Sequence, residues 1–187
     1  EALTHTPISA VLDIVIGNDL SAEDVATVRI GSTARSADIL ADPSKYDPRS
    51  KETADHSLPY VIAAAVADRQ VTPVQFTQEK IMDPRIRAQL NKVEVIADPE
   101  IEKVFPELQR ADVEIDTTDG RTFSTRLDYP KGDPRNPLTD SEIEAKFDAL
   151  AAPVMTDAAA ARVKDAVWSL EQQGSVTEFM ALATSDR

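Results

Sequence analysis

Apolar residues recur at helical spacing near the middle of the chain. The positions that share one helical face are Leu58, Val61, Ile62, Ala65 and Val66. Proline is tolerated only in the first turn of a helix, so Pro59 marks a beginning. The pattern predicts a helix that starts near Ser57 and ends near Asp68.

The flanking segments show shorter patterns. Residues 8–16 are predicted to be helical and are stopped by Gly17-Asn18. Alternation predicts strands at 25–30 and 93–96. Residues 41–53 are rich in Asp, Pro, Ser and Lys without periodicity, which favours an ordered surface loop. Thr72-Pro73 and Asp83-Pro84 indicate the starts of two short helices.

Residues 112–128 predict a β-hairpin whose turn contains Asp119-Gly120. A two-residue turn would set Ile115 against Ser124 and place the two apolar faces on opposite sides, which a half-buried sheet does not tolerate. A three-residue loop, 118–120, sets Ile115 against Phe123 and needs a left-handed residue, which Gly120 supplies. We expect this loop, with one face of the hairpin packed under the helix that follows His56.

The C-terminal region reads as three helices. Thr139 with Glu142, and Ser175 with Glu178, form capping-box patterns. Between them, a helix capped by Thr156 and ending before Gly174 carries an apolar stripe at Ala160, Val163, Val167 and Leu170. The predicted fold class is α+β, with a small antiparallel sheet covered by helices and C-terminal helices whose apolar faces pack elsewhere.

Candidate chemistry gathers just before the central helix. His56 is predicted at the helix N-terminus, where backbone N–H groups and the helix dipole favour an anion. Lys51 lies five residues earlier. A cation, an imidazole and free N–H groups suit binding and proton transfer on a carboxylate-rich small molecule. The competing interpretation is a histidine that only caps a surface helix.

The amino-acid composition argues against several classes of binding partner and cofactor. The net charge of −13 argues against nucleic acid, which needs clustered Lys and Arg, although a few cations in a dry cleft still bind an anion. The chain has no cysteine to hold an iron–sulfur cluster, and its two histidines, His5 and His56, have no metal-ligand spacing. No apolar run reaches the ~20 residues of a membrane span. We expect no metal, cofactor or membrane partner.

Several motifs together resemble one family. They are Lys51-Glu-Thr-Ala-Asp-His-Ser-Leu-Pro-Tyr60, Asp83-Pro-Arg-Ile86 and Tyr129-Pro-Lys-Gly-Asp-Pro-Arg-Asn-Pro-Leu-Thr139. In this order and spacing they resemble the MmgE/PrpD family. The resemblance implies that residues 1–18 end a helical-domain segment, 19–132 form an α+β lid domain, and 133–187 are helices that pack on a helical domain outside this chain. Glu1 is not a Met, so we expect a C-terminal portion of a longer protein.

The resemblance also implies an activity. We expect a metal-independent dehydratase, a hydro-lyase for 2-methylcitrate or a related tricarboxylate, that is cytoplasmic, homodimeric when complete and inactive as this fragment. The family pattern places His56 and Lys51 in the active site, with His56 in proton transfer and Lys51 in carboxylate binding. Weaker candidates for substrate contacts are Ser57, Tyr60, Arg49 and Lys131. For Tyr60 the competing interpretation is a packing aromatic with a bonded hydroxyl, and for Arg49 and Lys131 it is solvated surface charge.

This sequence departs from the family pattern at one position that bears on the reaction. In the decarboxylase branch of the family an active-site tyrosine lies forty-one residues after the motif histidine, and that position here is Ala97. The resemblance therefore favours dehydration over decarboxylation. The alternative function, from another class, is a non-catalytic module with the same fold that binds a carboxylate or a partner protein.

Overall fold

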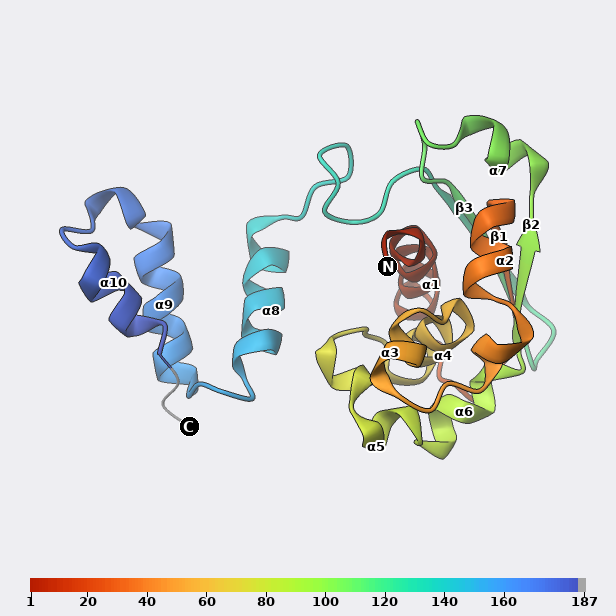
Figure 1. Cartoon of the computed structure of the whole chain (residues 1–187), viewed down its shortest axis with the longest axis horizontal. Coiled ribbons are helices and arrows are strands. Elements are labelled where there is room, and N and C mark those ends of the chain that lie inside the picture. Colours follow the sequence, from red (N-terminus) through yellow and green to blue (C-terminus); the bar gives the residue numbers. More distant parts are fainter. Residues whose placement is uncertain (185–187) are drawn as a thin grey trace. The chain divides into compact units, whose positions relative to one another are not determined.

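The computed structural model describes residues 1–184 and divides into two units, Glu1–Pro137 and a second that begins at Leu138. Each unit is described by itself. The first contains a sheet and helices (Figure 1): η1 Ala2–Thr4, α1 His5–Gly17, β1 Val25–Ser32, α2 Ala34–Leu40, η2 Pro43–Tyr46, α3 Lys51–Asp55, α4 Leu58–Asp68, η3 Pro73–Phe76, α5 Gln78–Ile81, α6 Pro84–Leu90, β2 Val93–Ala97, α7 Pro99–Val104, β3 Ala111–Thr117 and β4 Thr122–Leu127. The second contains α8 Asp140–Ala151, α9 Asp157–Trp168, η4 Leu170–Gln172 and α10 Val176–Leu182.

The strands form one sheet in the order β2-β1-β3-β4. β1 pairs antiparallel with β3, and β3 pairs antiparallel with β4. β2 instead pairs parallel with β1, because the chain returns through the helices α2 to α6 before it enters β2. The α+β class is confirmed, and the sheet is mixed rather than purely antiparallel.

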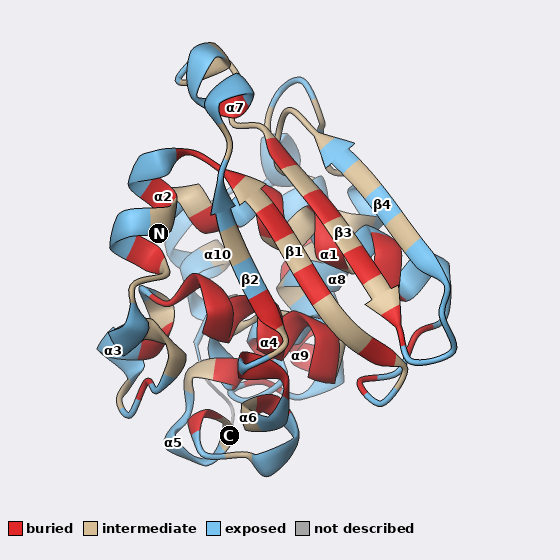
Figure 2. Cartoon of the chain, turned by 90° about the vertical axis from the view of Figure 1, so that its right-hand side faces the viewer, coloured by how far each residue is buried: buried red, intermediate tan, exposed pale blue. Residues whose placement is uncertain are grey.

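Helices cover one face of the sheet, and Figure 2 shows the other face toward the viewer. Along β3, the side chains of Ala111, Val113 and Ile115 are buried and alternate with partly exposed acidic residues. α1 packs on β3 and β4, whereas α4 packs on α1, α6 and β2. The hairpin therefore lies under α1, and the prediction that it packs under the helix after His56 is wrong. Both helices enter the same apolar core, so the sequence pattern alone did not distinguish them.

The hairpin register is confirmed. Ile115 pairs with Phe123 and Val113 pairs with Thr125. Thr117 N donates to Arg121 O at 2.8 Å, which closes a three-residue loop, and Gly120 has φ +85°. The left-handed glycine and the shared apolar face thus select the same turn.

The central helix α4 is confirmed between its predicted limits. The Ser57 side chain accepts a hydrogen bond from Tyr60 N and caps the helix, and Arg69 ends it in a left-handed conformation. Every residue from Leu58 to Ala67 is buried. The helix is consequently enclosed on all sides rather than on the single predicted stripe.

Several short helices lack a sequence pattern. Residues 41–53 were predicted to be a loop, but η2 occupies Pro43–Tyr46 and α3 begins at Lys51. α2, α5 and α7 were not predicted either. Side chains cap these helices: Thr33, Asp42, Ser50, Thr77 and Asp98 each accept a hydrogen bond from a backbone N–H. Single caps stabilise a turn or two without producing apolar periodicity.

In the second unit, both halves of the Thr139–Glu142 capping box are present. Ser175 caps α10 by accepting from Glu178 N. The stripe predicted on α9 is confirmed at Ala160 and Val163, which are buried. It is wrong at Val167, which is 48% exposed, and at Leu170, which lies beyond the end of the helix; Ala159 and Ala166 are buried instead. No helix in residues 1–184 is long and apolar enough to cross a membrane.

Candidate active site

The candidate residues lie at the junction of α3 and α4. Ser50 caps α3 through a reciprocal capping box with Thr53, so Lys51 is the first helical residue. α3 ends at His56, which has φ −108° and ψ 22°, and Ser57 then caps α4. His56 therefore separates two helices. It lies at the end of α3, one residue before the cap of α4.

The first turn of α4 is closed to solvent. Ser57 is fully buried; its hydroxyl donates to Lys45 O at 2.6 Å and accepts from Tyr60 N at 3.0 Å. Pro59 has no N–H group, and Leu58 is fully buried. The prediction of free N–H groups that bind an anion here is wrong, because the capping hydroxyl and the core occupy this helix end.

Ser57 and Tyr60 consequently serve the fold. Tyr60 is fully buried, and its hydroxyl donates to Gln75 O at 2.5 Å. Burial, together with the charges of Asp68 and Asp83, raises the pKa of Tyr60 to about 12. Neither side chain offers a free polar atom at the surface, so their placement does not support the substrate contacts expected for them.

His56 is exposed and oriented by a carboxylate. Its ring is 58% exposed, and Nδ1 lies 2.5 Å from Oδ1 of Asp55 and 3.2 Å from the Glu52 carbonyl oxygen. Both partners are acceptors, so Nδ1 carries the proton and Nε2 of the neutral ring keeps its lone pair. A base held by an orienting carboxylate is the arrangement that proton transfer requires. Sequence reasoning missed Asp55, although it directly precedes the histidine.

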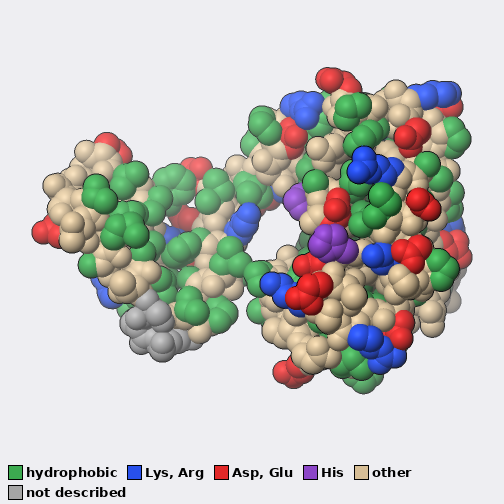
Figure 3. All heavy atoms as spheres, viewed as in Figure 1, with side chains coloured by type: hydrophobic (Ala, Val, Ile, Leu, Met, Phe, Trp, Pro, Cys, Tyr) green, Lys and Arg blue, Asp and Glu red, His purple; other side chains and the backbone are tan. Residues whose placement is uncertain are grey.

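Lys51 is exposed at the start of α3. Among the described residues, its ammonium group has no hydrogen-bond or ion-pair partner. At about 1.5 Å per helical residue, Lys51 and His56 are separated by about 7.5 Å along α3. That spacing suits a substrate that carries more than one carboxylate. Figure 3 shows the histidine side chains of the chain at the surface of the first unit.

The remaining candidates are placed differently. Arg49 is mostly exposed and its guanidinium contacts Asp47 at 2.7 Å, two residues before it. Lys131 lies in a tight loop beside α1, where its backbone N–H donates to Ser9 Oγ at 3.2 Å. Arg49 therefore adjoins the junction but is paired, and Lys131 lies in the loop that contacts α1.

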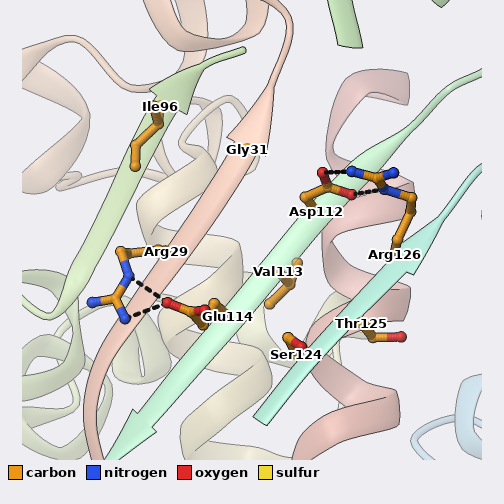
Figure 4. Close-up of a pocket in the computed structure, with 9 residues that line it drawn as sticks. All are labelled: Arg29, Gly31, Ile96, Asp112, Val113, Glu114, Ser124, Thr125 and Arg126. Carbon is orange, nitrogen blue, oxygen red and sulfur yellow. Dashed lines mark hydrogen bonds and ion pairs between the residues drawn. The ribbon is translucent and has the colours of Figure 1, made fainter. Parts of the chain in front are cut away.

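A separate hollow lies on the uncovered face of the sheet. It has a volume of about 590 Å³, and its charged lining comes from Arg29, Asp112, Glu114 and Arg126. Arg29 contacts Glu114 at 2.5 Å, and Arg126 contacts Asp112 at 2.5 Å (Figure 4). Arg29 also contacts Asp116 at 2.5 Å. The hydrogen bonds that Arg29 donates to Glu114 and Asp116 raise the pKa of Arg29. These arginines are held by acidic neighbours, and neither His56 nor Lys51 lines the hollow.

Residues 1–184 contain no group of three or more His, Cys, Asp or Glu side chains arranged to hold a metal ion. The junction offers one imidazole, one orienting carboxylate and one ammonium group. Chemically, this set can move a proton and bind an anion.

Known proteins resemble this chain. Cis-aconitate decarboxylase of Mus musculus is 32% identical over 108 residues, which are 58% of this chain and 22% of that protein. The protein of the same name from Homo sapiens is 33% identical over 109 residues, with the same shares covered. A cis-aconitate decarboxylase-like protein, oryM, of Aspergillus oryzae is 30% identical over 128 residues, 68% of this chain and 26% of that protein. The chain thus spans about a quarter of the length of these curated relatives.

The named relatives are lyases. The model of the MmgE/PrpD C-terminal domain matches residues 1–172, nearly the whole chain, including the α3–α4 junction and the loop at Lys131. The chain therefore belongs to the MmgE/PrpD family.

Proposed function

We propose that this chain is the C-terminal part of a metal-independent hydro-lyase for 2-methylcitrate or a closely related tricarboxylate. The observation that carries the proposal is the hydrogen bond between Asp55 and Nδ1 of an exposed His56. It occurs in a chain whose family includes lyases. Lys51, unpaired at the other end of α3, supplies the cation for a carboxylate.

Dehydration removes a proton from carbon and expels the neighbouring hydroxyl group as water. His56 suits either transfer: Nε2 of the neutral ring accepts the carbon-bound proton, or the imidazolium donates a proton to the leaving hydroxyl. Asp55 stabilises the imidazolium in both cases. Lys51 binds a carboxylate and offsets the negative charge that develops as the proton leaves. The complementary acid or base and further cations come from the rest of the complete protein.

Decarboxylation is the second candidate, because the named relatives are cis-aconitate decarboxylases. Ala97 speaks against it. The family resemblance places the active-site tyrosine of the decarboxylase branch at this position, and Ala97, the last residue of β2, has no hydroxyl group. We therefore favour dehydration.

The exposed apolar surface of the second unit supports the proposal that another part of the protein covers this unit. Several large apolar side chains are about half exposed or more, including Leu150, Val154, Trp168, Val176 and Met180. An apolar hollow of about 140 Å³ is lined by Ile143, Phe147, Val163, Val167 and Trp168. Apolar surface of this kind marks an interface. We propose that a preceding helical domain covers it and that the complete protein is a cytoplasmic homodimer.

The test uses the complete protein with 2-methylcitrate, citrate and cis-aconitate, each with and without a metal chelator. We expect 2-methylcitrate or citrate to lose water, seen as the ultraviolet absorbance of the unsaturated product, with no effect of the chelator. Release of carbon dioxide from cis-aconitate would establish the second candidate. Binding of these acids without turnover of any would establish a non-catalytic module.

A further inference from the structure

One arginine of α6 reaches the segment that leads into α3. The guanidinium of Arg87 is mostly covered, at 23% exposed, and it pairs with the Asp47 carboxylate. Its Nη1 also donates to Pro48 O at 3.3 Å and to Ile81 O at 3.5 Å. A planar guanidinium thus joins three segments: the end of α5, α6 itself and residues 47–48.

This segment sets the start of α3. The Asp47 carboxylate also binds Arg49, and the backbone N–H groups of Arg49 and Ser50 both donate to Thr53 Oγ1. Lys51 follows immediately. Arg87 is therefore attached to the backbone three residues before the cationic candidate, and the intervening residues are themselves bonded to α3.

A separate contact fixes the other end of the junction. Ser57, next to His56, donates to Lys45 O from within the core. His56 is additionally held by Asp55. Loss of the Arg87 contacts would leave these bonds intact, so it would release the Lys51 end of α3 while the His56 end stays fixed.

We propose that Arg87 is a positioning residue that sets Lys51 relative to His56 and so tunes carboxylate binding. It acts through Asp47 and the Pro48 carbonyl, and its own guanidinium is not a substrate contact. This inference rests on the proposed function, because it assumes that Lys51 binds a substrate carboxylate.

The experiment compares Arg87→Ala with Arg85→Ala in the complete protein. Arg85 lies on the same helix but donates to Ala67 O and pairs with Asp68, at the far end of α4. Binding of citrate and 2-methylcitrate is measured by calorimetry. We expect the Kd to rise about 10-fold in Arg87→Ala and to stay within about twofold in Arg85→Ala, since small displacements of a binding group weaken its contacts strongly.

A double-mutant cycle shows whether Arg87 acts through Lys51. In a Lys51→Ala background, Arg87→Ala should weaken binding no further, because the group that it positions is gone. Asp47→Asn removes the carboxylate from the other side of the ion pair and should reproduce the loss if Arg87→Ala does not fold. Arg87→Lys keeps the charge but not the fork to two carbonyls, so it should recover only part of the affinity.

The two proposals fail separately. Absence of turnover with intact citrate binding refutes the proposed reaction and leaves the role of Arg87 standing. Equal Kd values for the Arg87→Ala and Arg85→Ala proteins, an Arg87 effect that persists without Lys51, or a wild-type protein that binds neither acid would overturn the positioning role.

Discussion

The first unit carries two charged surfaces that use their charges differently. On the uncovered face of the sheet, Arg29 and Arg126 are each within 2.5 Å of a carboxylate on the neighbouring strand. At the α3–α4 junction, Lys51 has no such partner among the described residues, and His56 shares one nitrogen with Asp55 and leaves the other open. Paired charges hold strands together, whereas unpaired ones are available to a ligand. We therefore place the candidate site by the pairing of the charges rather than by the hollow on the sheet face.

Removal of the imidazole should distinguish the two surfaces most clearly. His56→Ala in the complete protein should lower kcat for dehydration by about 10²–10⁴, the usual effect of losing an acid–base group. Arg126→Ala, on the sheet face, is the matched control and should leave kcat unchanged. Rates are followed by the absorbance of the unsaturated product. A larger loss from Arg126→Ala than from His56→Ala would move the site to the sheet.

Lys51→Ala should have the next largest effect. A hydrogen bond to a charged group contributes about 1.5–3 kcal/mol, so KM should rise about 10- to 150-fold. Lys51→Arg keeps the positive charge and should recover part of the loss. Steady-state kinetics of the three proteins provide the measurement, and an unchanged KM in Lys51→Ala would remove Lys51 from the site.

The ion pair between Asp68 and Lys80 is an example of paired charges that stabilise the fold. The Asp68 side chain is 8% exposed and accepts from Lys80 at 2.6 Å and from Gln75 at 2.9 Å. Burial alone would raise the pKa of Asp68, but these hydrogen bonds and the charges of Lys80 and Arg85 outweigh it and lower the pKa below its usual value. Asp68→Asn should reduce the free energy of unfolding by about 1–3 kcal/mol at pH 7, because Lys80 loses the nearer of its two carboxylates and keeps only Asp83 at 3.9 Å.

The direction of the lowered pKa of Asp68 determines how the difference in stability between the wild-type and Asp68→Asn proteins changes with pH. A carboxyl whose pKa is lower in the folded state contributes stability that is present above its unfolded pKa, about 3.9, and lost as pH falls through the folded value. Urea unfolding at pH 7 and at successively lower pH should therefore show the wild-type and Asp68→Asn proteins converging below about pH 4. A difference that grows as the pH falls would contradict the assigned direction.

Arg29→Ala should destabilise the fold less than Asp68→Asn does. Its ion pairs are partly exposed, and such pairs contribute about 0.2–1 kcal/mol each, so we expect a loss of about 1 kcal/mol in the free energy of unfolding. Lys51→Ala should change this free energy by less than about 0.5 kcal/mol, as surface substitutions without partners do. Urea unfolding of both variants tests whether paired and unpaired cations differ as described.

Local rules predicted some features well. Pro59 and the apolar spacing located α4. The need to place the apolar residues of both strands on one face, together with a left-handed residue at Gly120, predicted the hairpin register. Local sequence patterns did not predict which distant segments contact one another. The parallel pairing of β2 with β1 joins residues about sixty-five positions apart, such as Val28 and Val93, and no local periodicity encodes it. The exposure of Val167 on α9 likewise depends on which neighbours that helix meets.

The candidate site divides in the same way. The motif located His56 and Lys51, but the orienting role of Asp55 depends on the backbone angles at the end of α3. The motif alone does not distinguish a serine that binds substrate from a serine that caps a helix, so Ser57 was a candidate for both roles. Arg87 lies forty residues beyond Asp47, and only the folded chain brings the two together.

Trp168 has a consequence for optical measurements. It is the only tryptophan of the chain, it lies in the second unit, and half of its surface is exposed beside the apolar hollow of α8 and α9. The three tyrosines, Tyr46, Tyr60 and Tyr129, all belong to the first unit. The intrinsic fluorophores therefore label the two units separately, so the loss of structure in each is seen at its own wavelength. A blue shift of the indole emission alone would report the moment at which another surface covers α8 and α9.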